Sequence, residues 1–116
     1  MKLNHLNLAV SDVLETQLFF EKYFGFRRLM PGSPAFAVLR GEDGFTLTLS
    51  NLNKASAVAY PEDFHIGFVQ ETEARVNEIN QQLRADGYDV AEPRKAHNSW
   101  TFYFRAPGGL LIEVLC

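Results

Sequence analysis

Hydrophobic and polar side chains alternate along residues 3–10, LNHLNLAV, and this period of two predicts a half-buried β-strand. Leu6 and Leu8 fall on the side expected to face a core. His5 and Asn7 therefore fall on the opposite, polar side. An imidazole placed on the open face of a strand is a candidate for chemistry, whereas one placed in the core is usually a packed residue with a backbone hydrogen bond.

The spacing then changes from a strand period to a helical one. Over residues 13–24, VLETQLFFEKYF, apolar side chains return every three or four positions, which predicts an amphipathic helix. Ser11 and Asp12 precede it as candidate N-caps, and Gly25 follows it as a typical terminating residue. The segment AFAVLRGEDGFTLTLSN, residues 35–51, is predicted to form a hairpin with GEDG, residues 41–44, as its turn, after a short strand at FRRL.

The second half of the chain repeats this pattern. FHIGFVQ predicts a strand, and residues 73–86 predict a helix that is followed by Gly87. YDVAEP, residues 88–93, is expected to be a short strand, and RKAHNS, residues 94–99, a polar loop. WTFYF and LLIEVL are predicted as two further strands.

The two halves can be superposed as copies of one βαβββ unit. When His5 is set on His65, the helix-ending glycines and the turn glycines fall at similar spacings, and Thr48 falls on Glu113. The predicted fold class is therefore α+β. We expect a single domain with module one at about residues 1–52, a linker at about 53–62 and module two at about 63–116.

The composition fits a small globular domain and narrows its partners. Of 116 residues, 47% are hydrophobic and 22% are charged, with a net charge of −3. The absence of a basic stripe argues against nucleic acid, and no apolar run is long enough for a signal peptide or a membrane span. The single cysteine, Cys116, cannot form an internal disulfide, so a cytoplasmic location fits best.

A carboxylate in the last predicted strand points to a metal site. Glu113 shares its face of the strand with Leu111 and Leu115, and a buried carboxylate is costly unless it is paired or coordinated. Together with His5 and His65 it forms a possible two-histidine, one-carboxylate site for one divalent transition metal: Fe, Mn, Zn, Ni or Co. The alternative is a buried His–Glu ion pair and one ordinary histidine.

These motifs, in this order, resemble the vicinal oxygen chelate superfamily of glyoxalases, fosfomycin-resistance transferases, extradiol dioxygenases and bleomycin-resistance proteins. LNHLNLAVSDV, YFGF, DFHIGF and FYFRAPGGLLIEV carry the resemblance over nearly the whole chain. It implies paired βαβββ modules that form a curved mixed sheet around a cleft, with His5, His65 and Glu113 at the ligand positions. The fourth position of the pattern, a carboxylate in glyoxalase I, is Thr48 here.

Other residues are placed at the cleft by strand alternation. Thr46 and Thr48 fall on the predicted cleft face, and Tyr103 lies opposite its phenylalanine neighbours, where its hydroxyl can act as a donor or weak acid. Glu113 and Tyr103 are the candidate catalytic residues. The candidate substrate cleft comprises Asn7, Thr46, Thr48 and Trp100.

Two functions of different classes follow from this pattern. The first is a metal-dependent lyase, transferase or dioxygenase, in which the metal acts as a Lewis acid on a small oxygen-bearing substrate. The second is a metal-free protein of the bleomycin-resistance type that sequesters a small molecule. A homodimer is expected in either case, because curved sheets backed by two helices leave apolar surface and strand edges uncovered and relatives commonly dimerise.

Overall fold

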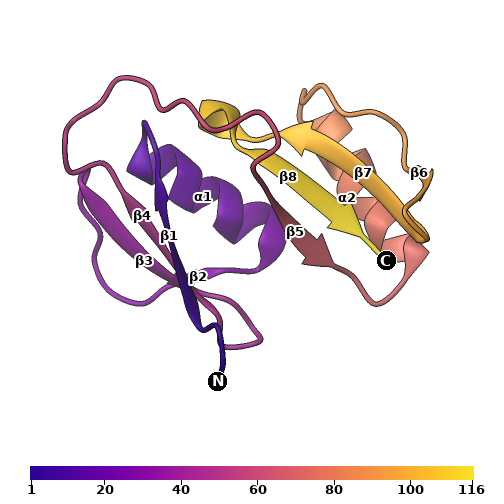
Figure 1. The fold of residues 1–116 in the computed structure, drawn as a ribbon, viewed down its shortest axis with the longest axis horizontal. Helices are drawn as coiled ribbons and strands as arrows, with labels where there is room; N and C mark the ends of the chain where they lie inside the picture. Colours follow the sequence, from indigo (N-terminus) through magenta and orange to yellow (C-terminus); the bar gives the residue numbers. More distant parts are fainter. The chain divides into compact units, whose positions relative to one another are not determined.

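The computed structural model describes all 116 residues and contains the βαβββ unit twice. The chain divides into two compact units, Met1–Ala59 and Tyr60–Cys116, called module one and module two below. In each module one helix covers one face of a four-stranded sheet (Figure 1). Module one contains β1 (His5–Ala9), α1 (Val13–Phe24), β2 (Arg27–Arg28), β3 (Phe36–Arg40) and β4 (Thr46–Ser50). Module two contains β5 (His65–Val69), α2 (Glu73–Ala85), β6 (Arg94–Ala96), β7 (Ser99–Arg105), the 3₁₀ turn η1 (Pro107–Gly109) and β8 (Leu111–Leu115).

The strand order is the same in both sheets, β1-β4-β3-β2 and β5-β8-β7-β6. The first strand of each module pairs in parallel with the last, and the remaining pairs are antiparallel. Asn7 lies opposite Thr48 in one sheet, and Gly67 lies opposite Glu113 in the other. The superposition of Thr48 on Glu113 is therefore confirmed at the level of strand register, and the mixed α+β fold is as predicted.

The core of module one lies between α1 and its sheet. Phe20 of α1 and Leu47 and Leu49 of β4 are fully buried there, and burying each such side chain stabilises the fold by about 1.5–3 kcal/mol. The Asp12 side chain accepts a hydrogen bond from the backbone N–H of Glu15 at 2.9 Å and so caps the helix. These packed faces leave the opposite side of the sheet to polar residues.

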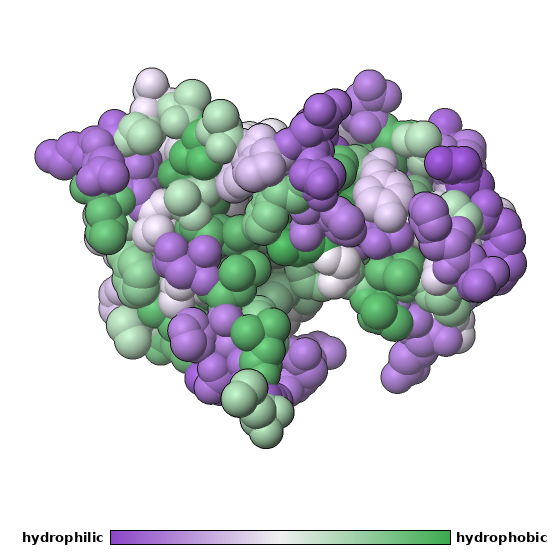
Figure 2. All heavy atoms as spheres, viewed as in Figure 1, coloured by the Kyte–Doolittle hydropathy of each residue, from purple (hydrophilic) through white to green (hydrophobic).

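Module two is built by the same rule. Ile79 and Leu83 of α2 pack with Ile112 and Val114 of β8, and all four side chains are buried. The hydroxyl oxygen of Thr72 caps the helix by accepting from the backbone N–H of Arg75 at 3.1 Å. On the face drawn in Figure 2, hydrophilic side chains gather at the edge of module two where β6 lies. No helix of the structure has the length and apolarity needed to cross a membrane.

The prediction of a strand at residues 88–93 is wrong, and the strand lies instead within the segment predicted as a polar loop. Residues 88–93 form no strand. Val90 among them is buried, and the Asn80 side chain of α2 donates to the carbonyl of Ala91 at 2.8 Å. The following segment forms β6, which pairs with β7 through a two-residue turn. His97 and Asn98 occupy that turn with φ values of 50° and 63°, the pattern of a type I′ turn.

Substitutions in the turn between β6 and β7 are expected to raise the stability of the protein. Asn-Gly is the preferred pair for a type I′ turn, so the double variant His97→Asn with Asn98→Gly is expected to raise the free energy of unfolding by about 0.5–1 kcal/mol. Denaturant unfolding measures this change. Gly44→Ala is the matched control: Gly44 has φ of 83° and open space around it, so the methyl group should cost about 1 kcal/mol. A double variant less stable than the parent would contradict the turn assignment.

Candidate functional site

Glu113 stands in the middle of the module two sheet, on the side away from α2. Its neighbours Ile112 and Val114 are fully buried toward the helix, whereas the Glu113 side chain is 13% exposed on the other face. Because β8 is a central strand, the carboxylate has strands on both sides and limited access to water. A charge in such a place has to be matched by partners on the sheet itself.

Two residues of β7 that carry hydroxyl groups, Thr101 and Tyr103, lie beside this carboxylate. Thr101 Oγ1 lies 3.0 Å from Glu113 Oε1 and 3.0 Å from the Val114 carbonyl oxygen, so its one proton is shared between two acceptors, and Tyr103 lies directly opposite Glu113 in the antiparallel register. A hydrogen bond to the Glu113 carboxylate raises the pKa of the Tyr103 phenol above its ordinary value of 10.0; burial and the negative charge of Glu113 raise this pKa further, while the charge of Arg94 lowers it. Tyr103 therefore keeps its proton and serves as a donor.

His65 faces the same carboxylate from β5. Its Nε2 lies 3.7 Å from Glu113 Oε2, and its Nδ1 lies 3.0 Å from the backbone carbonyl oxygen of Asp63. Since a carbonyl oxygen can only accept, Nδ1 carries the proton of this contact. In a neutral imidazole, Nε2 then presents a lone pair toward Glu113. Two electron-pair donors that face each other need a cation between them, either a proton on Nε2 or a metal ion.

The donor set fits a divalent metal. Two ligands bound at about 2.1 Å to one ion are separated by about 3.0–3.4 Å, and the Nε2 to Oε2 distance of 3.7 Å is slightly longer than this. It is too long for a hydrogen bond between the two groups. Metal-bound histidines commonly donate their second ring N–H to a backbone carbonyl, as His65 does to Asp63. The His–Glu ion pair with a protonated imidazole is the alternative for the same two side chains.

Gly67 keeps the space beside Glu113 open. It is the residue opposite Glu113 on β5, and a Cβ placed on it would lie 3.7 Å from Glu113 Oε2. A larger side chain at this position would extend over the carboxylate.

Module one has the same register but different chemistry. Asn7 stands at the position of Gly67, and Thr48 stands at the position of Glu113. Thr48 Oγ1 donates to Asn7 Oδ1 at 2.8 Å, and Asn7 Nδ2 donates to Ser50 Oγ at 3.0 Å. Thr46 and Thr48 are half-buried, and Leu47 between them is buried. The predicted side of the strand is confirmed for both threonines, while their contact with a substrate stays a prediction.

His5 is exposed on this face of β1, opposite Thr46. Its Nδ1 lies 2.8 Å from Asn4 Oδ1, which leaves Nε2 without a hydrogen bond. Its arrangement is thus similar to that of His65. Within neither module do three histidine, cysteine, aspartate or glutamate side chains come together. Module two supplies two candidate ligands, and the third ligand, predicted to be His5, stays a prediction.

Trp100 does not lie on the open face of the module two sheet, so its assignment to the substrate cleft is wrong. Trp100 Nε1 donates to Asn77 Oδ1 of α2 at 2.8 Å, which places the indole on the helix side of the sheet. Its neighbour Thr101 is the residue that reaches Glu113. Sequence reasoning missed Thr101 and Gly67. The alternation that placed Tyr103 on the open face places Thr101 there too, two residues earlier on the same strand.

Comparisons with known proteins agree with this architecture. The family model described as Glyoxalase/Bleomycin resistance protein/Dioxygenase superfamily matches residues 2–114. A search of curated proteins found no match. Among solved structures, the chain is similar to one described as a possible glyoxalase from Bacillus cereus, with 49% sequence identity and a TM-score of 0.90. That alignment covers 100% of this chain and 99% of the other.

More distant structures share the fold. Lactoylglutathione lyase from Agrobacterium tumefaciens has 17% identity and a TM-score of 0.77, with 98% of this chain and 92% of that chain covered. A variant of the fosfomycin resistance protein FosX from Listeria monocytogenes, in complex with Mn(II) and dihydroxypropylphosphonic acid, has 16% identity and a TM-score of 0.79. Here 99% of this chain and 88% of that chain are covered. The match of the family model over residues 2–114 and the 49% identity over the whole length show that the chain belongs to the glyoxalase/bleomycin resistance protein/dioxygenase superfamily.

Proposed function

We propose that this protein is a divalent-metal-dependent enzyme that acts on a small, oxygen-bearing substrate. The observation that carries the proposal is the approach of His65 Nε2 to Glu113 Oε2 at 3.7 Å, with Nδ1 of the same ring held by the Asp63 carbonyl. This arrangement presents two ligand atoms to one point on the open face of the sheet. His65 and Glu113, with His5 from module one, are the residues that would hold the ion.

When bound, the ion would supply Lewis acidity to a substrate that offers two neighbouring oxygens. The residues of the chain prepare the place for it. Thr101 fixes one oxygen of Glu113 and thereby turns the other toward His65. Gly67 leaves room above the carboxylate. The Tyr103 hydroxyl, which retains its proton, can donate a hydrogen bond to a substrate oxygen as negative charge develops there.

The relatives support this class of function without fixing the reaction. The Bacillus cereus structure is described as a possible glyoxalase, and the FosX variant was solved with Mn(II). For the present chain, Fe, Mn, Zn, Ni and Co all remain candidates, as do lyase, thiol-transferase and dioxygenase reactions. The homodimer also stays a prediction; Leu14 and Leu18, which are 58% and 54% exposed on α1, are apolar surface that such a contact could cover.

Removal of one ligand tests the metal site directly. His65→Ala is expected to weaken divalent metal binding by at least about a hundredfold while the circular dichroism spectrum stays that of a folded protein, because the exposed imidazole contributes little to the core. Isothermal titration with Mn(II), Co(II), Ni(II) and Zn(II) measures the affinity. His97→Ala, which removes a histidine of the β6–β7 turn, is the control and should bind as the parent does.

Two results would contradict the metal proposal. If His65→Ala and the parent bind metal equally well, the site lies elsewhere. If the parent binds none of the four ions, the His65–Glu113 pair is an ion pair, and a metal-free binding protein becomes the better description. His5→Ala tests the third ligand separately, because its loss should weaken binding only if module one contributes to the same site.

The raised pKa of Tyr103 beside Glu113 predicts a pH dependence for the metal-free protein. The phenol should ionise above pH 10, because the carboxylate stabilises its protonated form. The stabilisation is fully present below the ordinary pKa and is lost as pH rises through the raised one. Carbon NMR of labelled tyrosines, assigned with Tyr103→Phe, measures this pKa. In Glu113→Gln it should move back toward 10; an unchanged pKa would show that Glu113 is not the cause.

The threonine at position 48 leads us to expect little or no glyoxalase activity. The Thr48 hydroxyl donates a hydrogen bond to Asn7 Oδ1 and stays protonated at neutral pH. It therefore cannot act as the second carboxylate of a glyoxalase-type proton transfer. The protein loaded with Ni(II), Co(II) or Zn(II) is expected to turn over the methylglyoxal–glutathione hemithioacetal slowly or not at all. A turnover near the common enzyme value of about 10 per second would overturn the argument from Thr48.

A further inference from the structure

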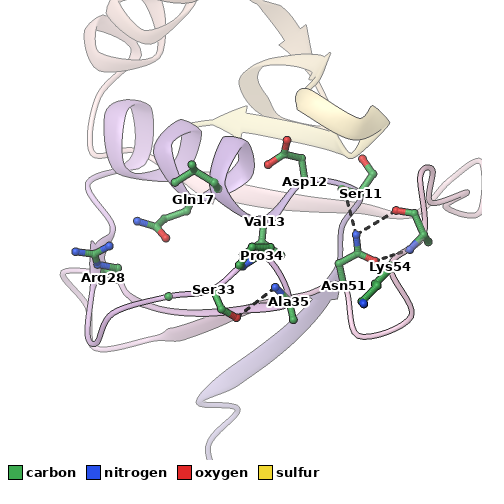
Figure 3. A pocket seen from close by; sticks show the side chains of 13 residues that line it. Ser11, Asp12, Val13, Gln17, Arg28, Ser33, Pro34, Ala35, Asn51 and Lys54 are labelled. Carbon is green, nitrogen blue, oxygen red and sulfur yellow. Dashed lines mark hydrogen bonds between the residues drawn. The ribbon is translucent and has the colours of Figure 1, made fainter.

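A pocket of about 650 Å³ lies within module one, outside the proposed metal site (Figure 3). It is bounded by the first half of α1, by the loop between β2 and β3, and by the segment that follows β4. Its volume is within the range of small-molecule pockets, about 300–1,000 Å³. His5, Asn7, Thr46 and Thr48 do not line it.

Gln17 brings an unsatisfied acceptor to this pocket. The residue is only 5% exposed, and its Nε2 donates to Glu21 Oε1 at 3.1 Å. Because a carboxylate accepts, this bond fixes the orientation of the amide, so Oε1 is the atom left over. No donor of the protein reaches Oε1. Because no buried side-chain atom of the structure lacks a hydrogen-bond partner, this Oε1 is accessible from the pocket and can accept from a ligand O–H or N–H.

Gly32 lies beside this oxygen. A Cβ on Gly32 would lie 3.4 Å from Gln17 Oε1 and 3.4 Å from Ala37 Cβ. The backbone of Gly32 is not in the left-handed region, so alanine can replace it without backbone strain. The missing side chain therefore leaves the approach to Gln17 open.

Arg28 and Ser33, which both line the pocket, supply a positive charge and a free hydroxyl proton. Arg28 forms no ion pair, and Ser33 Oγ accepts from the backbone N–H groups of Ala35 and Phe36, both at 3.2 Å, which leaves its own proton for donation. In Figure 3 the Gln17 amide extends from α1 toward Arg28, the last residue of β2, while Lys54 lies at the other end of the pocket. The Asp12 carboxylate, which caps α1, makes that other end less favourable for an anion.

We propose that this pocket binds a small organic anion that also carries an O–H or N–H group. Arg28 and Ser33 bind the anionic group, a carboxylate or a phosphate ester, and Gln17 Oε1 accepts the donor. This site is separate from the metal centre, so it does not depend on the proposed enzymatic function.

Nitrogen–proton NMR titration of the full, metal-free chain tests the proposal. The probes are L-malate, which has two carboxylates and a hydroxyl, succinate, which lacks the hydroxyl, and glycerol 3-phosphate, which replaces the carboxylate by a phosphate. L-malate or glycerol 3-phosphate should cause saturable shifts at the Gly32 amide and the Gln17 side-chain amide. Succinate should bind about tenfold more weakly than L-malate, since it leaves Gln17 Oε1 unpaired. Binding of only one of the two hydroxylated probes identifies the anionic group as carboxylate or phosphate.

Variants separate this site from general electrostatic attraction. Arg28→Gln and Gly32→Ala should each weaken the better probe about tenfold, whereas Lys54→Gln, which removes the same charge at the other end, should weaken it less than about threefold. His65→Ala should leave binding unchanged. The proposal is overturned if neither hydroxylated probe causes saturable shifts, if Arg28→Gln and Lys54→Gln weaken binding equally, or if the pocket signals respond only to protein concentration, which would indicate that a second copy covers the pocket.

Discussion

The placement of one carboxylate in the middle of a sheet is the constraint around which module two is arranged. Glu113 loses most of its access to water because β8 is paired on both sides, and its strand neighbours are committed to the core. The surrounding residues offset this cost: the Thr101 hydroxyl lies within hydrogen-bonding distance of Glu113, the Tyr103 phenol lies opposite it and keeps its proton, and His65 offers a site for positive charge. Thr101 contacts Oε1, and the other oxygen, Oε2, is directed at an imidazole that holds its own proton on the far nitrogen. The Glu113 carboxylate and His65 Nε2 together are well suited to hold a cation, because without one two electron pairs face each other.

The two modules show how a shared backbone can carry unequal chemistry. Their strand orders and registers coincide, so each position of one sheet has a counterpart in the other. In module one the counterparts of Gly67 and Glu113 are Asn7 and Thr48, which form a hydrogen bond with each other. That face is satisfied by neutral groups, and it contributes one candidate ligand, His5. In module two, glycine opposite glutamate produces open space next to an ionisable group.

The fold was predictable because strand and helix periods, caps and glycines all indicate the same unit twice. The side of the strand was also predictable for Thr48, Glu113 and Tyr103, since alternation decides it. The errors arose where local pattern competes with tertiary contacts. Residues 88–93 have strand-like composition, but the side chain of Asn80 on α2 donates a hydrogen bond to the carbonyl of Ala91, which a strand would use for pairing. Trp100 was included in the candidate cleft, although the alternation that places Tyr103 on the open face places Trp100 on the other, where it donates to Asn77 of α2. The acceptor on Gln17 could not be predicted, because it depends on which amide atom meets Glu21.

The separation of core and open face explains why this fold tolerates changes of function. The buried residues that stabilise each module, such as Phe20 and Ile112, lie on the helix side of the sheets. The candidate functional groups lie on the other side and are held by hydrogen bonds to neighbouring strands, as Glu113 is held by Thr101. A substitution on the open face therefore removes few core contacts, whereas it changes which cation or ligand the face can hold. Fold alone thus assigns no reaction in such a family, and the reaction has to be inferred from the few side chains on the open face.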